Sequence, residues 1–118
     1  MSVEETVKVC YRTSEGNNFF YDLKADFPAF KGHFEAAPVL PAVCQMSFCA
    51  DAARRLLNKN MEVTAVKRAK FIGPVLPNMT LRINLTQRED GLFLAELFQG
   101  DSLKKLSRLI LQFTERTV

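Results

Sequence analysis

Residues 27–55 read FPAFKGHFEAAPVLPAVCQMSFCADAARR, and this stretch decides the fold that the sequence predicts. It contains His33, the single histidine of the chain. Pro38 and Pro41 each fix φ and lack an N–H, so the segment between them is expected to be stiff and extended. Apolar residues then recur at helical spacing over 42–57, and proline is favoured where a helix starts. The stretch therefore predicts a rigid loop that carries an imidazole to the start of one long helix.

The rest of the chain reads as strands separated by turns. The expected strands are Thr6–Arg12, Phe19–Lys24, Glu62–Ile72, Thr80–Arg88, Leu92–Gln99 and Leu103–Thr114. The first two are expected to pair as a hairpin, and the last four to follow one another as a meander. The simplest α+β arrangement is one antiparallel sheet of five to six strands wrapped around one long central helix. We expect a single domain over residues 1–118.

Composition excludes several classes of function. Cys10, Cys44 and Cys49 lack the spacing of a metal site, so we expect buried free thiols and no metal. The net charge of +3 is too small to indicate nucleic-acid binding; it suits an acidic partner such as a carrier protein, although a solvated surface is the favoured explanation. No apolar run approaches the roughly 20 residues that span a membrane, and the acidic N-terminus is unlike a signal peptide. We expect a cytoplasmic protein that binds neither nucleic acid nor membrane.

The segment GHFEAAPVLPAV resembles the GHFPGNPVLPGV signature of hotdog-fold 3-hydroxyacyl thioester dehydratases, which serve bacterial fatty-acid and polyene synthesis. Gln45 resembles the glutamine of the aryl-polyene branch. A second motif of the family is similar to Lys70-Phe71 followed by Pro74 and Pro77. Together the motifs cover about half of the chain. The positions that match the signature are Gly32, His33, Phe34, Pro38, Val39, Leu40, Pro41 and Val43.

The resemblance implies a hotdog fold and a reaction without a cofactor. Its substrate would be a 3-hydroxyacyl thioester of acyl carrier protein or coenzyme A, and its product a trans-2-enoyl thioester. His33 would be the general base, and the backbone N–H of Ala42 would stabilise the enolate-like oxygen. Substrate-binding positions implied by the signature are Phe34, Pro38, Leu40 and Val43. Family members pair, so the resemblance also implies a homodimer or larger assembly, or a heterodimer with another hotdog protein.

The sequence departs from the family at the catalytic acid. The Glu or Asp of the family falls on Ser47, whose hydroxyl is a poor proton donor at neutral pH. Asp51 lies one helical turn later and has two interpretations: an acid in an apolar cavity, or an ion pair with Arg54 or Arg55, which we favour. The glycine at the helix start is replaced by Ala42.

Three functions therefore stay open. The first is dehydration, with His33 as base and Asp51 as acid. The second is a non-catalytic subunit that binds acyl carrier protein, or that pairs with a hotdog protein supplying the acid. The third is thioester hydrolysis using Ser47 or Asp51. Cys44 is either an activated thiol beside His33 or, as we favour, a core cysteine.

Overall fold

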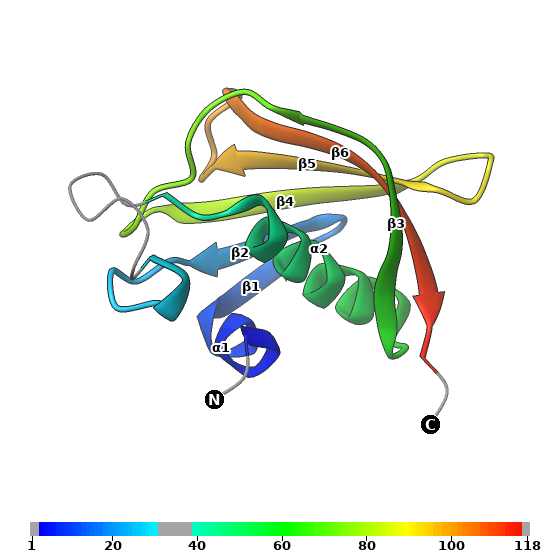
Figure 1. Ribbon diagram of the computed structural model, residues 1–118, viewed down its shortest axis with the longest axis horizontal. Coiled ribbons are helices and arrows are strands. Elements are labelled where there is room, and N and C mark those ends of the chain that lie inside the picture. Colours follow the sequence, from blue (N-terminus) through cyan, green and yellow to red (C-terminus); the bar gives the residue numbers. More distant parts are fainter. Residues whose placement is uncertain (1–2, 31–38, 117–118) are drawn as a thin grey trace.

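The structure is a computed structural model that describes residues 3–30 and 39–116. Six strands form one antiparallel sheet in the order β1-β2-β4-β5-β6-β3, which curves around the long helix α2 (Figure 1). The elements in chain order are α1 (Val3–Cys10), β1 (Tyr11–Glu15), β2 (Asn18–Asp22), the 3₁₀ turn η1 (Pro28–Phe30), α2 (Ala42–Leu57), β3 (Met61–Phe71), β4 (Thr80–Gln87), β5 (Phe93–Gln99) and β6 (Lys105–Glu115). The expected α+β arrangement is confirmed.

Helix α2 has the bounds that the sequence predicts. It starts after Pro41, whose φ of −62° and ψ of 155° are extended, and it ends at Asn58, which adopts the left-handed conformation common at helix ends. Phe48 and Cys49 are fully buried because the concave face of the sheet covers this side of the helix. Neither α1 nor α2, the described α-helices, has the length and apolar character that a membrane span requires.

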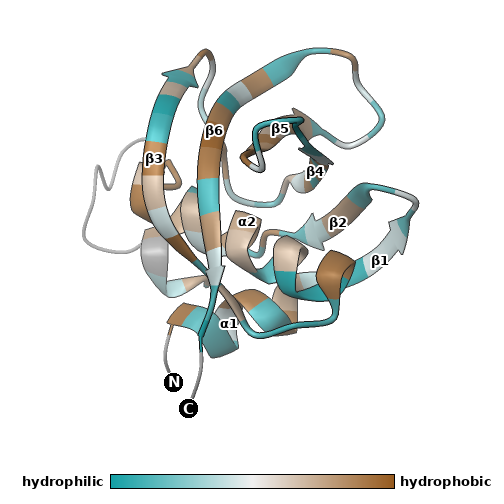
Figure 2. Cartoon of the chain, turned by 90° about the vertical axis from the view of Figure 1, so that its right-hand side faces the viewer, coloured by the Kyte–Doolittle hydropathy of each residue, from teal (hydrophilic) through white to brown (hydrophobic). Residues whose placement is uncertain are grey.

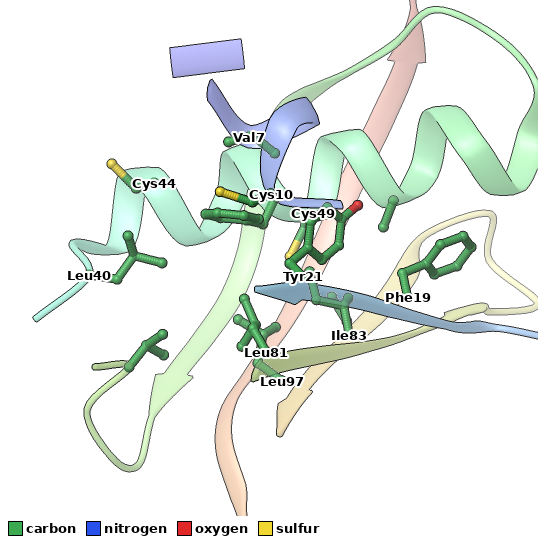
Figure 3. Close-up of a cluster of buried hydrophobic side chains, with 14 of the residues drawn as sticks. Val7, Cys10, Phe19, Tyr21, Leu40, Cys44, Cys49, Leu81, Ile83 and Leu97 are labelled. Carbon is green, nitrogen blue, oxygen red and sulfur yellow. The ribbon is translucent and has the colours of Figure 1, made fainter. Parts of the chain in front are cut away.

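The core lies between α2 and the inward faces of the central strands. Alternate residues of β4 point inward, and Leu81, Ile83 and Leu85 are all fully buried. Strand β2 contributes Phe19 and Tyr21 in the same way, and these side chains gather between the helix and the sheet (Figure 3). The strict alternation of the sequence thus becomes one apolar face that packs on α2.

The N-terminal segment is a helix, so the prediction of a strand over Thr6–Arg12 is wrong. Val7 is 1% exposed whereas Val9 is 73% exposed, which is the burial pattern of a helix and not of a strand. Val7 and Cys10 lie three residues apart and bury one side of α1, which packs against α2. Strand β1 begins only at Tyr11 and pairs with β2 in the expected hairpin.

The expected meander of four strands holds only for β4, β5 and β6. Strand β3 pairs with β6 on its far side and forms an edge of the sheet, with two irregularities in its register. The chain returns from this edge to the middle of the sheet over residues 72–79, where the N–H groups of Ile72 and Gly73 donate to the Leu106 carbonyl. Local alternation of apolar and polar residues does not specify which distant strands pair. The prediction that β3 lies next to β4 is therefore wrong.

Two substitutions in α1 test the corrected assignment. Val7→Lys buries a cation in the core, and we expect it to lower the free energy of unfolding by at least about 3 kcal/mol. Val9→Lys places the same side chain in solvent, and we expect a change within about 0.5 kcal/mol. Urea denaturation followed by circular dichroism measures both. Similar losses in the two variants would contradict the helix, because a strand would bury both valines together.

Candidate functional site

A groove of about 500 Å³ runs between α2 and β3. Its walls are mainly apolar. At one end of the groove lie three charged residues, Glu4, Arg54 and Glu62, and Ser47 lies between this end and the first turn of α2. The open side of α2 therefore offers a long apolar surface that begins at the start of the helix. The apolar lining residues are Val43, Met46, Ala50, Val63, Ala65 and Val66.

The first turn of α2 is fixed by backbone hydrogen bonds. The N–H groups of Cys44 and Gln45 donate to the Pro41 carbonyl at 3.0 and 3.1 Å. The Leu40 N–H donates to the Val75 carbonyl at 2.8 Å, which ties the entering chain to the crossing segment. In the described part of the chain no acceptor is found for the Ala42 N–H. A free N–H at a helix N-terminus, where the dipole is positive, suits an oxygen that gains negative charge.

Gln45 holds this first turn against the sheet. Its side chain is 5% exposed. Its amide nitrogen donates to the Leu40 carbonyl at 3.2 Å, and its amide oxygen accepts from the Ser107 hydroxyl at 2.7 Å. Ser107 is itself fully buried on β6. Chemical reasoning from the sequence missed this pair; the signal was a polar residue in an otherwise apolar helical turn.

The predicted site residues on α2 divide between the groove and the core. Val43 is 65% exposed and lines the groove. Ser47 also lines the groove, and its hydroxyl donates to the Val43 carbonyl at 3.2 Å. Leu40 is buried in the core and is not part of the groove lining.

Asp51 lies on the core side of α2 and is 2% exposed. Its Oδ2 accepts from the Tyr21 hydroxyl and from Nε of Arg55, each at 2.7 Å. The Arg55 guanidinium in turn lies 3.5 Å from the centre of the Tyr11 ring. Burial, together with the adjacent Asp51, raises the pKa of Tyr21, so the phenol keeps its proton and donates it to the carboxylate.

The ion pair between Asp51 and Arg55 is the favoured sequence interpretation, and the structure confirms it. The other candidate partner, Arg54, instead donates to the Met61 carbonyl at 2.9 Å and pairs with Glu4. Asp51 is not part of the groove lining, so the structure does not bring it together with Ser47 there.

The remaining candidates lie in the core or outside the described residues. Cys44 is 8% exposed, and burial raises the pKa of its thiol, which is opposite to the activation that a nucleophile needs. His33, Phe34 and Pro38 lie outside the described residues. Among the residues that are described, no group of three or more His, Cys, Asp or Glu could hold a metal ion.

The buried Asp51 network generates a stability prediction. Asp51→Asn removes the carboxylate that faces Tyr21 and Arg55, and we expect it to lower the free energy of unfolding by about 2 kcal/mol. Tyr21→Phe leaves the ion pair in place and should cost about 1 kcal/mol. Asp90 also pairs with an arginine but is exposed, so Asp90→Asn serves as the control and should stay within about 0.5 kcal/mol.

Urea titration of these variants and of the Tyr21→Phe/Asp51→Asn double variant measures the coupling. The free energy of unfolding should fall less in the double variant than the sum of the losses in the two single variants, since both substitutions break the same hydrogen bond. Strict additivity would show that the 2.7 Å contact contributes nothing to stability.

Solved structures of similar shape support the fold. An uncharacterized protein from Erwinia carotovora subsp. atroseptica has a TM-score of 0.67 and 23% identity, with 89% of this chain and 90% of that chain covered. The dehydratase heterocomplex ApeI:P from Xenorhabdus doucetiae has a TM-score of 0.71 and 21% identity, covering 89% and 94%. The E. coli PaaI protein of the phenylacetic acid degradation operon has a TM-score of 0.59 and 13% identity, covering 97% and 89%.

At these identities the solved structures establish the hotdog fold alone. No curated protein sequence matches the chain significantly. A family model described as ApeI-like, ApeI dehydratase, matches residues 11–105 and so covers most of the chain, from β1 to the start of β6. The match includes the loop signature, all of α2 and the whole groove wall of β3. The chain therefore belongs to the ApeI dehydratase-like family of hotdog proteins.

Proposed function

We propose that this protein binds 3-hydroxyacyl thioesters and takes part in their dehydration to trans-2-enoyl thioesters. The substrate is carried on the phosphopantetheine arm of an acyl carrier protein or of coenzyme A, and the reaction uses no cofactor. The observation that carries the proposal is the groove that begins at the first turn of α2. Its apolar wall starts at Val43, which follows Ala42 in the chain, and the Ala42 N–H has no acceptor among the described residues. An acyl chain fits the wall, and a thioester oxygen fits the helix start.

Dehydration needs a base, an oxyanion donor and an acid. In this proposal His33 removes the proton from C2, and a neutral imidazole suits that step near pH 7. The Ala42 N–H stabilises the charge that develops on the thioester oxygen. The C3–O bond then breaks, the leaving hydroxyl takes a proton from the acid and departs as water, and the double bond forms between C2 and C3. Phe34, Pro38 and Val43 line the acyl site.

Two candidate mechanisms differ in the residue that supplies the catalytic acid. In the first, Asp51 is the acid, and its carboxyl must leave Tyr21 and Arg55 to reach the substrate. In the second, this chain binds the acyl group and another hotdog subunit supplies the carboxyl. The second is favoured by the hydrogen bonds that hold Asp51 on the core side and by the bond from Ser47 to the Val43 carbonyl. Hydrolysis by Ser47 has no comparable support, since the hydroxyl donates to backbone.

Mutant rates separate the candidates. His33→Ala should abolish dehydration while the circular dichroism spectrum stays native, because losing a general base costs about 10²-fold to 10⁴-fold. Ser47→Glu introduces a carboxyl into the groove and should raise the rate of the purified chain at least about 10-fold. The assay is enoyl-thioester formation from 3-hydroxyacyl carriers of several chain lengths.

Asp51→Asn decides the identity of the acid in the same assay. A fall of at least about 10²-fold in the dehydration rate would identify Asp51 as the catalytic acid. An unchanged, substantial rate would remove Asp51 from the mechanism. If neither native protein nor Asp51→Asn turns over and only Ser47→Glu does, the chain is a binding subunit. A dehydration rate that is unchanged by His33→Ala would contradict both candidate mechanisms, because both use His33 as the base.

The unpaired edge of β3 supports pairing with a second hotdog chain. The strand has eleven residues, and within residues 3–30 and 39–116 it pairs with β6 alone. Long edge strands tend to find a partner, and Glu62 near one end of β3 and Lys70 near the other would meet across an antiparallel pair of identical strands. We propose at least a homodimer, or a heterodimer with another hotdog protein, in the cytoplasm, where the three thiols stay reduced.

Light scattering at micromolar concentration tests the assembly. We expect a mass of at least two chains, because the free edge of β3 is then paired. Glu62→Lys should weaken the assembly by placing like charges opposite one another, and Glu62→Lys/Lys70→Glu should restore it. A monomer in the native protein would contradict the proposal for self-association.

A further inference from the structure

The groove ends in a wall of ion pairs at the C-terminal end of α2. Arg54 on α2, Glu62 on β3 and Glu4 on α1 are the charged residues of its described lining. The Arg54 guanidinium lies 3.6 Å from the Glu4 carboxylate, and Arg116 lies 3.9 Å from Glu4 and 3.3 Å from Glu62. We name Glu4, Arg54, Glu62 and Arg116 the ion-pair wall. The end of β6 runs down beside α1 here, with hydrophilic residues in both (Figure 2).

Arg54 is held in the wall from two directions. Its Nε donates to the Met61 carbonyl at 2.9 Å, and its Nη1 faces Glu4. The Arg54 side chain is 16% exposed, whereas that of Glu4 is 38% exposed. Separating a largely buried cation from its partner has a large cost in free energy. The guanidinium is therefore a fixed boundary of the groove, which an entering molecule does not easily push aside.

The wall lies at a set distance from the start of α2. Val43, Met46 and Ala50 form the apolar side of the helix that leads to Arg54. Val43 and Arg54 are eleven positions apart, which is about 16 Å along the helix axis. Helical side chains lean toward the N-terminus, so Arg54 shortens this apolar stretch further. A saturated chain advances roughly 1.3 Å per carbon, since its C–C bonds of about 1.5 Å form a zigzag, and the stretch therefore has room for about ten carbons.

The change from apolar to charged lining reverses the effect of each added methylene. A methylene that leaves water for the apolar part of the groove strengthens binding about 4-fold. A methylene placed against Arg54 removes water from a charged group or separates it from Glu4, and either change opposes binding. The gain in affinity should therefore stop where the apolar lining ends.

We propose that the ion-pair wall limits the bound acyl group to about ten carbons, so that the chain selects short and medium acyl thioesters. The inference rests on the proposed function, because it takes the acyl chain to enter the groove from the start of α2. Glu4 precedes residues 11–105 of the family match and Arg116 follows them. Two of the four wall residues thus lie outside the part of the chain that defines the family.

Binding of saturated acyl-coenzyme A thioesters tests the limit, with acyl groups of about six to about fourteen carbons in steps of two. These probes have no 3-hydroxyl group, so they bind without reacting. Isothermal titration calorimetry, at concentrations below micelle formation, gives the Kd for each length. In the native protein the affinity should rise at least about 5-fold per step up to about ten carbons, and less than about 2-fold per step beyond.

Two variants should move the limit in opposite directions. Glu4→Ala/Arg54→Ala removes one charge of each sign, and it should tighten binding of the longest probe at least about 10-fold while shorter probes stay within about 2-fold. Ala50→Leu fills the groove one helical turn, about 5.4 Å, before Arg54, and it should shorten the limit by about four carbons. Arg88→Ala/Asp90→Ala removes an exposed ion pair at the β4–β5 turn and is the matched control, which should keep the native limit.

The possible outcomes separate the wall from the proposed function. An affinity that keeps rising to the longest probe in native protein would overturn the wall and leave the dehydration proposal in place. So would an unmoved limit in either variant whose circular dichroism spectrum is native, or an equal shift in the control. A limit that moves as expected, in a protein that never dehydrates 3-hydroxyacyl thioesters, would support the wall and reject dehydration. Absence of binding at every length would contradict both.

Discussion

The burial of α2 within a curved sheet is the constraint on which the rest of the structure depends. A helix covered over most of its surface cannot leave polar side chains without partners, because an unpaired buried group costs about 1–3 kcal/mol. Gln45 forms hydrogen bonds with Leu40 and Ser107, and Asp51 forms hydrogen bonds with Tyr21 and Arg55. Among the residues described, no buried side-chain nitrogen or oxygen lacks a partner. These bonds fix the rotation of α2 and therefore decide which side faces the groove.

Local pattern predicted the elements whose burial follows their own sequence. The sixteen residues of α2 and the alternation of β4 needed no distant partner to be recognised. The N-terminal segment fits two periods, because Val7 and Val9 alternate while Val7 and Cys10 also lie on one helical side. Packing of α1 on α2 selects the second period, and no local signal contains that contact. The position of β3 beside β6 has the same origin, since it depends on where the crossing segment docks.

The contacts of the candidate site also include local ones, which the sequence predicts, and long-range ones, which it does not predict. The Asp51–Arg55 pair spans four residues of one helix, so sequence spacing predicts it. The bond from Tyr21 to Asp51 spans thirty residues and joins β2 to α2, so it depends on the packed fold. Ser107 is hidden for the same reason, because a serine in an alternating strand looks like any solvent-facing residue. The groove lies between α2 and β3, so it could not be predicted without knowing the position of β3 in the sheet.

The surfaces around the groove are separable because they use different parts of β3. Pairing with a second strand uses the backbone N–H and C=O groups along the free edge, whereas Arg68 and Lys70 stand on the outer face, level with Ile110 and Arg108. The inward side of the same strand offers Val63 to the groove. In the function proposed above, one strand would therefore hold a second subunit at its edge and an acyl chain on its inward face, so the subunit that supplies a carboxyl to the groove need not displace the acyl chain.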